Sequence, residues 1–317
     1  MTTVALVGGG VVGRRIRQRL SFVLPDAHIV DVDPRLSERG LDNSEIVLLA
    51  SPAPHAPLAE RLVSAGTHVV SVSDDLDDVS DLLQLDDRAH ASGATLFVGA
   101  GMAPGLSGLL ARHLADQLAV CDEIHIAMHG TAGPACARQH HDALSGTGIG
   151  LHDGMWIRRP SGSGRELCWF PEPVGAYDCY RAELASPLLL RDVFPGVARI
   201  SARVSATRRD RFTAWLPMLR PPHPEGGVGA LRVEVRGADS AGERVALVVG
   251  LAEQVGTTAA ATATAVVPPI VDGGTPTGVV CAGDPRLDTP GLLHRIEHLG
   301  VRIQEFTGIP TASGVEV

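Results

Sequence analysis

Three glycines near the N-terminus have the spacing of a phosphate-binding turn. Gly8, Gly10 and Gly13 follow the apolar run Val4–Val7 and begin a segment with helical periodicity. In such a turn the first glycine permits a tight bend, the second lets a pyrophosphate approach the backbone, and the third lets helix and strand pack closely. The helix N-terminus adds a positive potential for the phosphates. The motif predicts a dinucleotide site formed by Gly8, Gly10, Val11, Val12 and Gly13.

An acidic residue lies where the ribose of that dinucleotide would be bound. Asp31 falls near the end of the next expected strand, His28–Val32, and 18 residues after Gly13. A carboxylate there favours a free 2′-hydroxyl and therefore NAD. Asp33 offers a second carboxylate or is a turn residue. Arg35 and Arg39 would instead suit the 2′-phosphate of NADP, which stays open. A glycine-rich turn without any cofactor is the alternative.

A proline-containing loop follows the next apolar run, Ile46–Ala50. Ser51 and Pro52 would lie at the carboxyl edge of a parallel sheet, beside the cofactor. We therefore expect both residues to line the cofactor site. The alternative is a loop that only begins the next helix.

Lysine is absent, so all 27 basic residues are arginines. Schiff-base, lysine general-base and P-loop chemistry are excluded. For hydride transfer, the remaining candidate proton donors are chiefly histidines. His129 ends the expected strand 123–128, and His141 lies on the expected helix 134–144. The side chains of His140 and His141 diverge by about 100° around that helix, so at most one of these two histidines faces a given pocket. We select His129 and His141, with a polar strand end and a solvated helix face as the alternatives.

Several other side chains could bind a metal or a substrate, but their spacing in the sequence does not indicate a site. Cys136 and His140 share a helical face, but no second ligand pair has matching spacing, so we expect no metal. Tyr177 and Tyr180 could donate to a substrate or pack normally. The pairs Arg158-Arg159 and Arg208-Arg209 would suit a carboxylate or a charged surface turn.

The elements that position these residues form two patterns. Strands and helices alternate up to about residue 118, which predicts an α/β fold with an N-terminal, doubly wound parallel sheet of Rossmann type. Only twelve residues, 34–45, separate the second and third strands, so this domain is trimmed. The runs 199–206, 231–236 and 244–251 then suggest a mostly antiparallel sheet. We expect a dinucleotide-binding domain over 1–122, an α+β substrate or dimerisation domain over 123–255, and helices in 256–317 that return to the first domain.

Composition narrows the class of protein. The formal net charge of −9 argues against nucleic acid and anionic membranes as partners. Five cysteines without a Cys-x-x-Cys pair are typical of a reduced chain. The N-terminus has no signal-peptide pattern, and no apolar run could span a membrane, so we expect a cytoplasmic protein.

The segment 99–107, Gly-Ala-Gly-Met-Ala-Pro-Gly-Leu-Ser, and the N-terminal glycine motif together resemble the saccharopine dehydrogenase-like family of NAD(P)-dependent Rossmann oxidoreductases. The resemblance adds Gly99 and Gly101 to the expected cofactor-binding residues. Ala103 stands where the family commonly has Asp. The resemblance implies hydride transfer at a carbon–nitrogen bond of a small, carboxylated amine or imine, in a homodimer.

Two other functions stay open. A sugar or alcohol dehydrogenase of the glucose–fructose oxidoreductase type would have the same first domain, but its usual Glu-Lys-Pro motif cannot exist without lysine. A non-catalytic dinucleotide sensor or scaffold would need no catalytic dyad.

Overall fold

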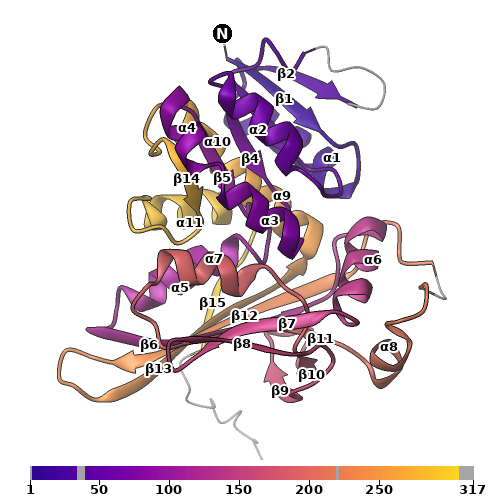
Figure 1. The fold of residues 1–317 in the computed structure, drawn as a ribbon, viewed down its shortest axis with the longest axis vertical. Helices are drawn as coiled ribbons and strands as arrows, with labels where there is room; N and C mark the ends of the chain where they lie inside the picture. The colour runs from indigo at the N-terminus through magenta and orange to yellow at the C-terminus, as the bar shows by residue number, and fades with distance from the viewer. Residues whose placement is uncertain (1, 34–39, 219–220, 307–317) are drawn as a thin grey trace, which may run out of the picture.

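Six parallel strands form the first sheet, in the spatial order β14-β5-β4-β3-β1-β2. The computed structural model describes residues 2–33, 40–218 and 221–306. The expected Rossmann-type sheet is confirmed (Figure 1). Its strands are β1 (Thr3–Val7), β2 (His28–Val32), β3 (Ile46–Leu49), β4 (His68–Ser71), β5 (Thr95–Val98) and β14 (Gly278–Cys281).

Continuous apolar strands explain this sheet. All four residues of β3 are buried, and so are all four of β5, as expected for strands covered on both faces. The short connection before β3 agrees with the strand order, because β3 lies directly beside β1 and β2 remains at the edge. The helices that follow these strands are α1 (Val11–Val23), α2 (Ala56–Ser64), α3 (Leu76–Leu83), α4 (Asp86–Ser92) and α5 (Leu106–Ala115).

A nine-stranded mixed sheet forms the second layer, with the path β15-β13-β12-β6-β11-β10-β9 and the hairpin β7–β8 joined to β11. Its strands are β6 (Val120–His129), β7 (Thr147–His152), β8 (Met155–Pro160), β9 (Glu166–Trp169), β10 (Ala176–Tyr180), β11 (Arg199–Ser205), β12 (Val228–Ala238), β13 (Arg244–Gln254) and β15 (Gln304–Phe306). The helices among them are α6 (Pro134–Ala143), α7 (Ser186–Val193) and α8 (Arg208–Thr213).

The expected, mostly antiparallel pairing of this region is confirmed, and the exception is β6, which pairs with β11 in parallel. The alternation of apolar residues indicates which face is buried and not the direction of the partner. The turn of the β7–β8 hairpin lies at Asp153 and Gly154, which both have positive φ.

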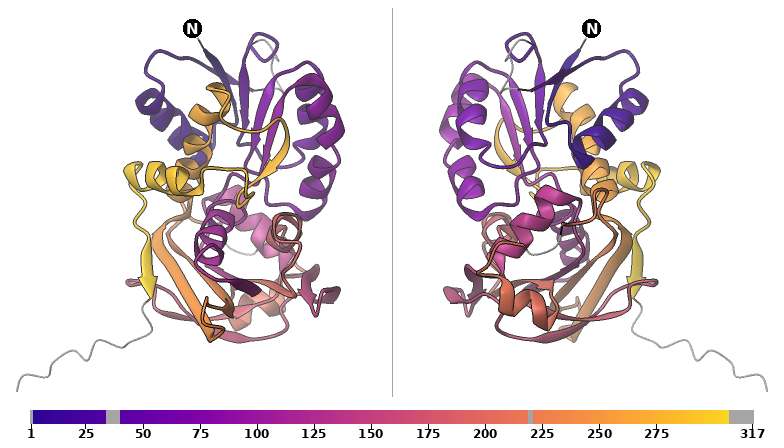
Figure 2. Two further views of the ribbon diagram at one scale, coloured as in Figure 1. Left: turned by 90° about the vertical axis from the view of Figure 1, so that its left-hand side faces the viewer. Right: turned by 90° about the vertical axis from the view of Figure 1, so that its right-hand side faces the viewer.

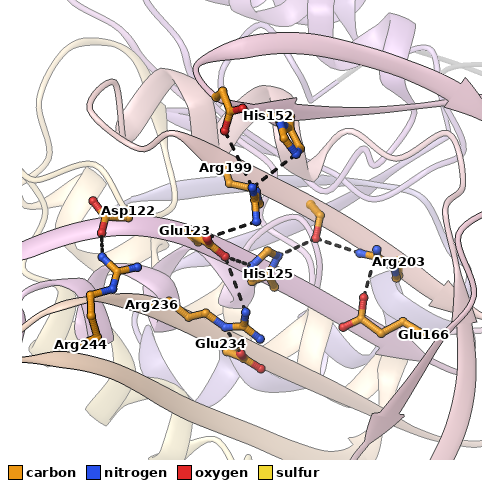
Figure 3. A network of polar contacts seen from close by, with 12 residues as sticks. Asp122, Glu123, His125, His152, Glu166, Arg199, Arg203, Glu234, Arg236 and Arg244 are labelled. Atoms are coloured by element: carbon orange, nitrogen blue, oxygen red, sulfur yellow. Dashed lines mark hydrogen bonds and ion pairs between the residues drawn. The ribbon is translucent and has the colours of Figure 1, made fainter.

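The two faces of the large sheet differ in chemistry. On β6, Ile124, Ile126 and Met128 are buried in the main core, on the side where α5 and α7 pack. Glu123 and His125 point to the opposite face, because successive side chains alternate across a strand. On that face they join a network of charged side chains (Figure 3). We call this face the outer face.

The C-terminal part of the chain returns to both sheets (Figure 2). Helix α9 (Val255–Ala265) packs against α1, and α11 (Thr289–His298) packs against α5 and α9. The short helix α10 (Val267–Val271) lies between α9 and β14 along the chain. The structure adds what the sequence pattern did not predict, since β14 joins the first sheet and β15 joins the second. Among the described residues, no helix is both long and apolar enough to span a membrane.

Candidate functional site

A cavity of about 1240 Å³ begins at the glycine turn and extends to helix α6 of the second layer. Close packing of backbone shapes it. A Cβ on Gly13 would lie 1.7 Å from the carbonyl oxygen of Gly8, so only glycine lets α1 approach β1 here. At Gly133, the residue before α6, a Cβ would lie 2.9 Å from Val11 Cγ2. The start of α6 therefore lies against the glycine turn.

Most of the residues predicted to bind a cofactor line this cavity. They are Gly8, Gly10, Val11, Val12, Asp31, Asp33, Ser51, Pro52 and Gly101. Gly13 lies beneath the turn and supports it without lining the cavity. Gly99 also lies outside the lining, and a Cβ on it would lie 2.6 Å from Leu189 Cδ1 and 3.0 Å from Pro104 Cβ. Arg35 and Arg39 fall outside the described residues.

Asp31 lies at one end of the cavity, where β2 approaches its end. Its carboxylate forms an ion pair of 2.8 Å with Arg17 of α1. Both side chains are about half exposed, at 58% for Asp31 and 47% for Arg17. An ion pair this exposed contributes little to stability. The carboxylate can therefore exchange Arg17 for a ligand hydroxyl at small cost.

The loop 51–55 is held by a buried histidine. The two ring nitrogens of His55 lie 2.8 Å from Ser71 Oγ and 2.9 Å from the Ser51 carbonyl oxygen. Burial lowers the pKa of His55, so the neutral ring is favoured. The Asp78 carboxylate accepts a hydrogen bond of 2.7 Å from the backbone N–H of His55. These contacts fix Ser51 and Pro52 at the cavity wall.

The other end of the cavity holds a cluster of Asp74, Cys136 and His140, which we call the cavity cluster. The His140 Nε2 atom lies 3.4 Å from an Asp74 carboxylate oxygen and 3.7 Å from the Cys136 sulfur. Asp74 follows β4 of the first sheet, whereas Cys136 and His140 lie on α6. The cluster therefore joins the two layers across the cavity.

The electrostatics of His140 favour its protonated form. Burial alone would disfavour the imidazolium, but Cys136 and Asp74 together outweigh it and raise the pKa of His140 well above its ordinary value. Its Nδ1 atom is buried and has no hydrogen-bond partner among the described residues. The ring is thus a charged, incompletely bonded group at the cavity wall.

Neither histidine selected from the sequence lines the cavity. His129 follows Met128, which does line it, and points to the outer face. There its Nδ1 lies 2.8 Å from Ser205 Oγ and its ring lies 4.1 Å from that of Tyr177. His141 Nε2 donates a hydrogen bond of 2.8 Å to the Leu216 carbonyl oxygen. The arrangement favours His140 in place of both.

Helical phase is the reason that the sequence did not separate His140 from His141. At most one of the two could point into the cavity, and the position of α6 beside the glycine turn and Asp74 determines that it is His140. The sequence position of Asp74 gave a weak indication of a site residue, since an acid just after a buried parallel strand lies at the sheet edge where ligands bind. The three ligand atoms of the cluster also lie within 4.8 Å of one another, a spacing that suits a metal ion. Sequence spacing alone could not show this, because Asp74 is distant in the chain.

The structure resembles solved structures although its sequence is distant from them. No family model and no curated protein matches the sequence. Saccharopine dehydrogenase (L-Glu forming) from Saccharomyces cerevisiae superposes with a TM-score of 0.68 at 13% identity, over 96% of this chain and 100% of that chain. The two proteins share a fold. A meso-dapdh variant from Clostridium tetani E88 superposes with a TM-score of 0.50 at 13% identity, over 92% and 96% of the two chains.

Proposed function

We propose that this protein is an NAD-dependent oxidoreductase that transfers hydride at a carbon–nitrogen bond of a small, carboxylated amine or imine. One observation supports it most directly. A single cavity joins a dinucleotide-binding glycine turn and the Asp31 carboxylate to a charged histidine at the opposite end. The fold shared with saccharopine dehydrogenase supports a dehydrogenase, and the absence of lysine, which excludes a Glu-Lys-Pro motif, favours this type over the sugar dehydrogenase type.

The residues present fit an NAD cofactor. The backbone N–H groups at the start of α1 face the cavity beside Gly8 and Gly10 and would hold the pyrophosphate. Asp31 would accept hydrogen bonds from the ribose hydroxyls, and its charge would disfavour a 2′-phosphate. The bound nicotinamide would supply or accept the hydride. Ser51 and Pro52 line the path between the ribose end and the cavity cluster.

His140 would act as the proton donor and acceptor. In the reductive direction the imine carbon gains a hydride, and its nitrogen gains the proton that His140 loses. Asp74 holds the imidazolium before transfer, and the buried ring is regenerated by a proton from solvent. The raised pKa of His140 keeps its ring protonated before transfer, so the ring can act as the donor in the reductive direction.

Arg138 would recognise the substrate carboxylate. It lies on α6 two residues from His140, lines the cavity and is exposed. It makes no ion pair with an acidic residue in the described part of the chain. A guanidinium group binds a carboxylate through two parallel hydrogen bonds, which would hold the substrate carboxylate at the wall of this cavity.

The first test is nucleotide binding to the Asp31→Ala variant, followed by fluorescence. We expect the Kd for NADH to rise about tenfold, because hydrogen bonds to a charged acceptor are lost. The Kd for NADPH should fall or stay constant, since Arg17 loses its partner. Asp26→Ala is the control, because Asp26 is exposed at the turn before β2 and outside the cavity.

Two outcomes would contradict the proposal. If neither nucleotide binds the unaltered protein, the glycine motif is only a turn. If nucleotide binds but no imine formed from keto acids and amines is reduced, and no deuterium is transferred from C4-labelled NADH to a product carbon, the protein is a sensor and not an enzyme. Light scattering would test the predicted homodimer separately.

A further inference from the structure

A second cavity, of about 350 Å³, opens on the outer face of the large sheet. It is lined by five arginines but by only two acidic residues, Glu123 and Glu166. The arginines are Arg159, Arg181, Arg199, Arg203 and Arg236. This excess of positive charge is notable in a chain whose formal net charge is −9.

Both carboxylates in this cavity are already paired (Figure 3). Glu123 lies 3.3 Å from Arg199 and also contacts Arg236. Glu166 lies 3.0 Å from Arg203. Three of the five arginines are therefore ion-paired with the two carboxylates of the cavity.

Arg159 and Arg181 make no ion pair with an acidic residue within residues 2–33, 40–218 and 221–306. Arg159 lies on β8, is exposed and donates only to the carbonyl oxygen of its neighbour Arg158. Arg181 lies just after β10 and is half-buried. Two guanidinium groups thus face one small cavity without a counter-charge of their own.

Gly164 brings two of the guanidinium groups together. Its carbonyl oxygen accepts a hydrogen bond of 3.3 Å from Arg203 Nε. A Cβ on Gly164 would lie 1.7 Å from Arg181 Nη1, so Arg181 occupies the space that a side chain would need. Arg181 and Arg203 therefore meet at one residue.

This crowding opposes the charge on Arg181. Burial lowers the pKa of Arg181, and repulsion from Arg203 and from Arg159 lowers it further. Attraction to Glu166 raises it by less than either repulsion lowers it. An anion in the cavity would relieve this repulsion and give the unpaired donors a partner.

We propose that this cavity binds a small dianionic oxyanion, a phosphate group, through Arg159 and Arg181. A dianion matches the two unpaired positive charges, and each guanidinium can donate two parallel hydrogen bonds to it. The volume admits a phosphate with a small organic body, at the lower end of the range for ligand pockets. The site lies on the opposite face of the sheet from the proposed dinucleotide site and does not depend on it.

Inorganic phosphate is the probe, followed by isothermal titration calorimetry and by thermal unfolding at constant ionic strength. We expect phosphate to raise the Tm of the unaltered protein more than chloride does. Arg159→Met should weaken phosphate binding about tenfold or more, since hydrogen bonds to a charged ligand are lost. Arg181→Met should do the same and, without phosphate at low salt, should unfold at a Tm equal to or above that of the unaltered protein.

The matched control is Arg158→Met, one residue away on β8 and outside the cavity lining, which should bind phosphate normally. Acetate tests the charge of the ligand and should bind more weakly than phosphate. Because Arg159 is exposed, its variant remains informative if Arg181→Met does not fold. Equal phosphate effects in all three variants and the unaltered protein would overturn the proposal, and so would no effect beyond that of chloride.

Discussion

His125 on the outer face and His140 in the main cavity both lie beside a carboxylate, but they differ in how many of their ring nitrogens are hydrogen-bonded. On the outer face, both ring nitrogens of His125 are bonded, one to Ser201 Oγ at 2.8 Å and one to Glu123 at 2.9 Å (Figure 3). Glu123 itself is shared with Arg199 and Arg236. In the main cavity, His140 faces Asp74 and Cys136 through one nitrogen, and its Nδ1 has no partner among the described residues.

The comparison separates stability from chemistry. The Glu123 carboxylate is fully occupied by His125, Arg199 and Arg236 and has no free acceptor for a ligand, so we expect it to contribute to folding alone. His140 is buried, lies beside the Asp74 carboxylate and has one ring nitrogen without a partner in the described part of the chain, so it can exchange a proton or a hydrogen bond with a bound molecule. We expect changes in the cavity cluster to alter turnover, and changes in the outer-face network to alter unfolding.

The largest expected effect is on turnover by the His140→Asn variant. Loss of a general acid lowers kcat by about 10²- to 10⁴-fold, because the substrate nitrogen then takes its proton from solvent. The Kd for NADH should change little. The assay is NADH oxidation with whichever imine the substrate screen identifies.

His141→Asn is the control for this experiment, because His141 donates to Leu216 and does not line the cavity. Turnover within threefold of the unaltered enzyme in His140→Asn would remove the proposed role. Treatment with a chelator tests the metal alternative for the same cluster, since a proton donor would be insensitive to it.

The next effect is on stability, in the Glu234→Ala variant. Glu234 is almost fully buried on β12 and bonds to Arg232 and Arg236. Removing it leaves the half-buried Arg232 without its partner, which should lower the free energy of unfolding by about 3 kcal/mol. Urea unfolding measures this, and the Kd for NADH should be unchanged.

Glu243→Ala serves as the matched change, because Glu243 is exposed at the turn of the same hairpin. It should alter the free energy of unfolding by no more than about 0.5 kcal/mol. Equal losses in the two variants would show that the network contributes nothing beyond surface charge.

The smallest effect is a pair of opposite pH dependences. The pKa of His140 is raised by folding, so its contribution to stability is present below about pH 6.5 and is lost as pH rises through the folded-state pKa. Burial opposes ionisation of Glu234, but Arg232 and Arg236 outweigh it and lower the pKa of the carboxyl. Its contribution is present above about pH 4.3 and is lost as pH falls further.

These dependences can be measured as the difference in unfolding free energy between each variant and the unaltered protein across pH. The His140→Asn difference should shrink on the alkaline side, and the Glu234→Ala difference should shrink on the acidic side. Differences that move together would contradict the assignment of separate electrostatic environments.

The sequence predicted the first sheet well because its signals are local. Val4–Val7 and Ile46–Leu49 are short apolar runs followed by turn residues, and both become buried strands. The direction of β11 beside β6 could not be predicted, since the two strands are far apart in the chain and alternation is the same in either direction. The strand β14 is as short as β3, but it begins at Gly278 and pairs with β5, which lies far earlier in the chain, so no local alternation of strand and helix assigned it to the first sheet.

The candidate site also has a part that local sequence spacing predicts and a part that it does not. The glycine motif and Asp31 were found because a fixed spacing connects them, and they line the cavity as the motif requires. The cavity cluster was missed because no spacing connects Asp74 to α6. Only the packing of one layer against the other brings the three side chains together, and it also determines that His140 faces inward.

The return of the chain end to both sheets has a consequence for synthesis of the protein. Until residue 281 has left the ribosome, β5 is an uncovered edge of the first sheet, with backbone groups open to another chain. The last described strand, β15, covers the free edge of β13 in the second sheet. A nascent chain that stops before these segments would contain the whole glycine turn and yet leave two strand edges unpaired. The strands β14 and β15 therefore protect the protein against edge-to-edge association during translation.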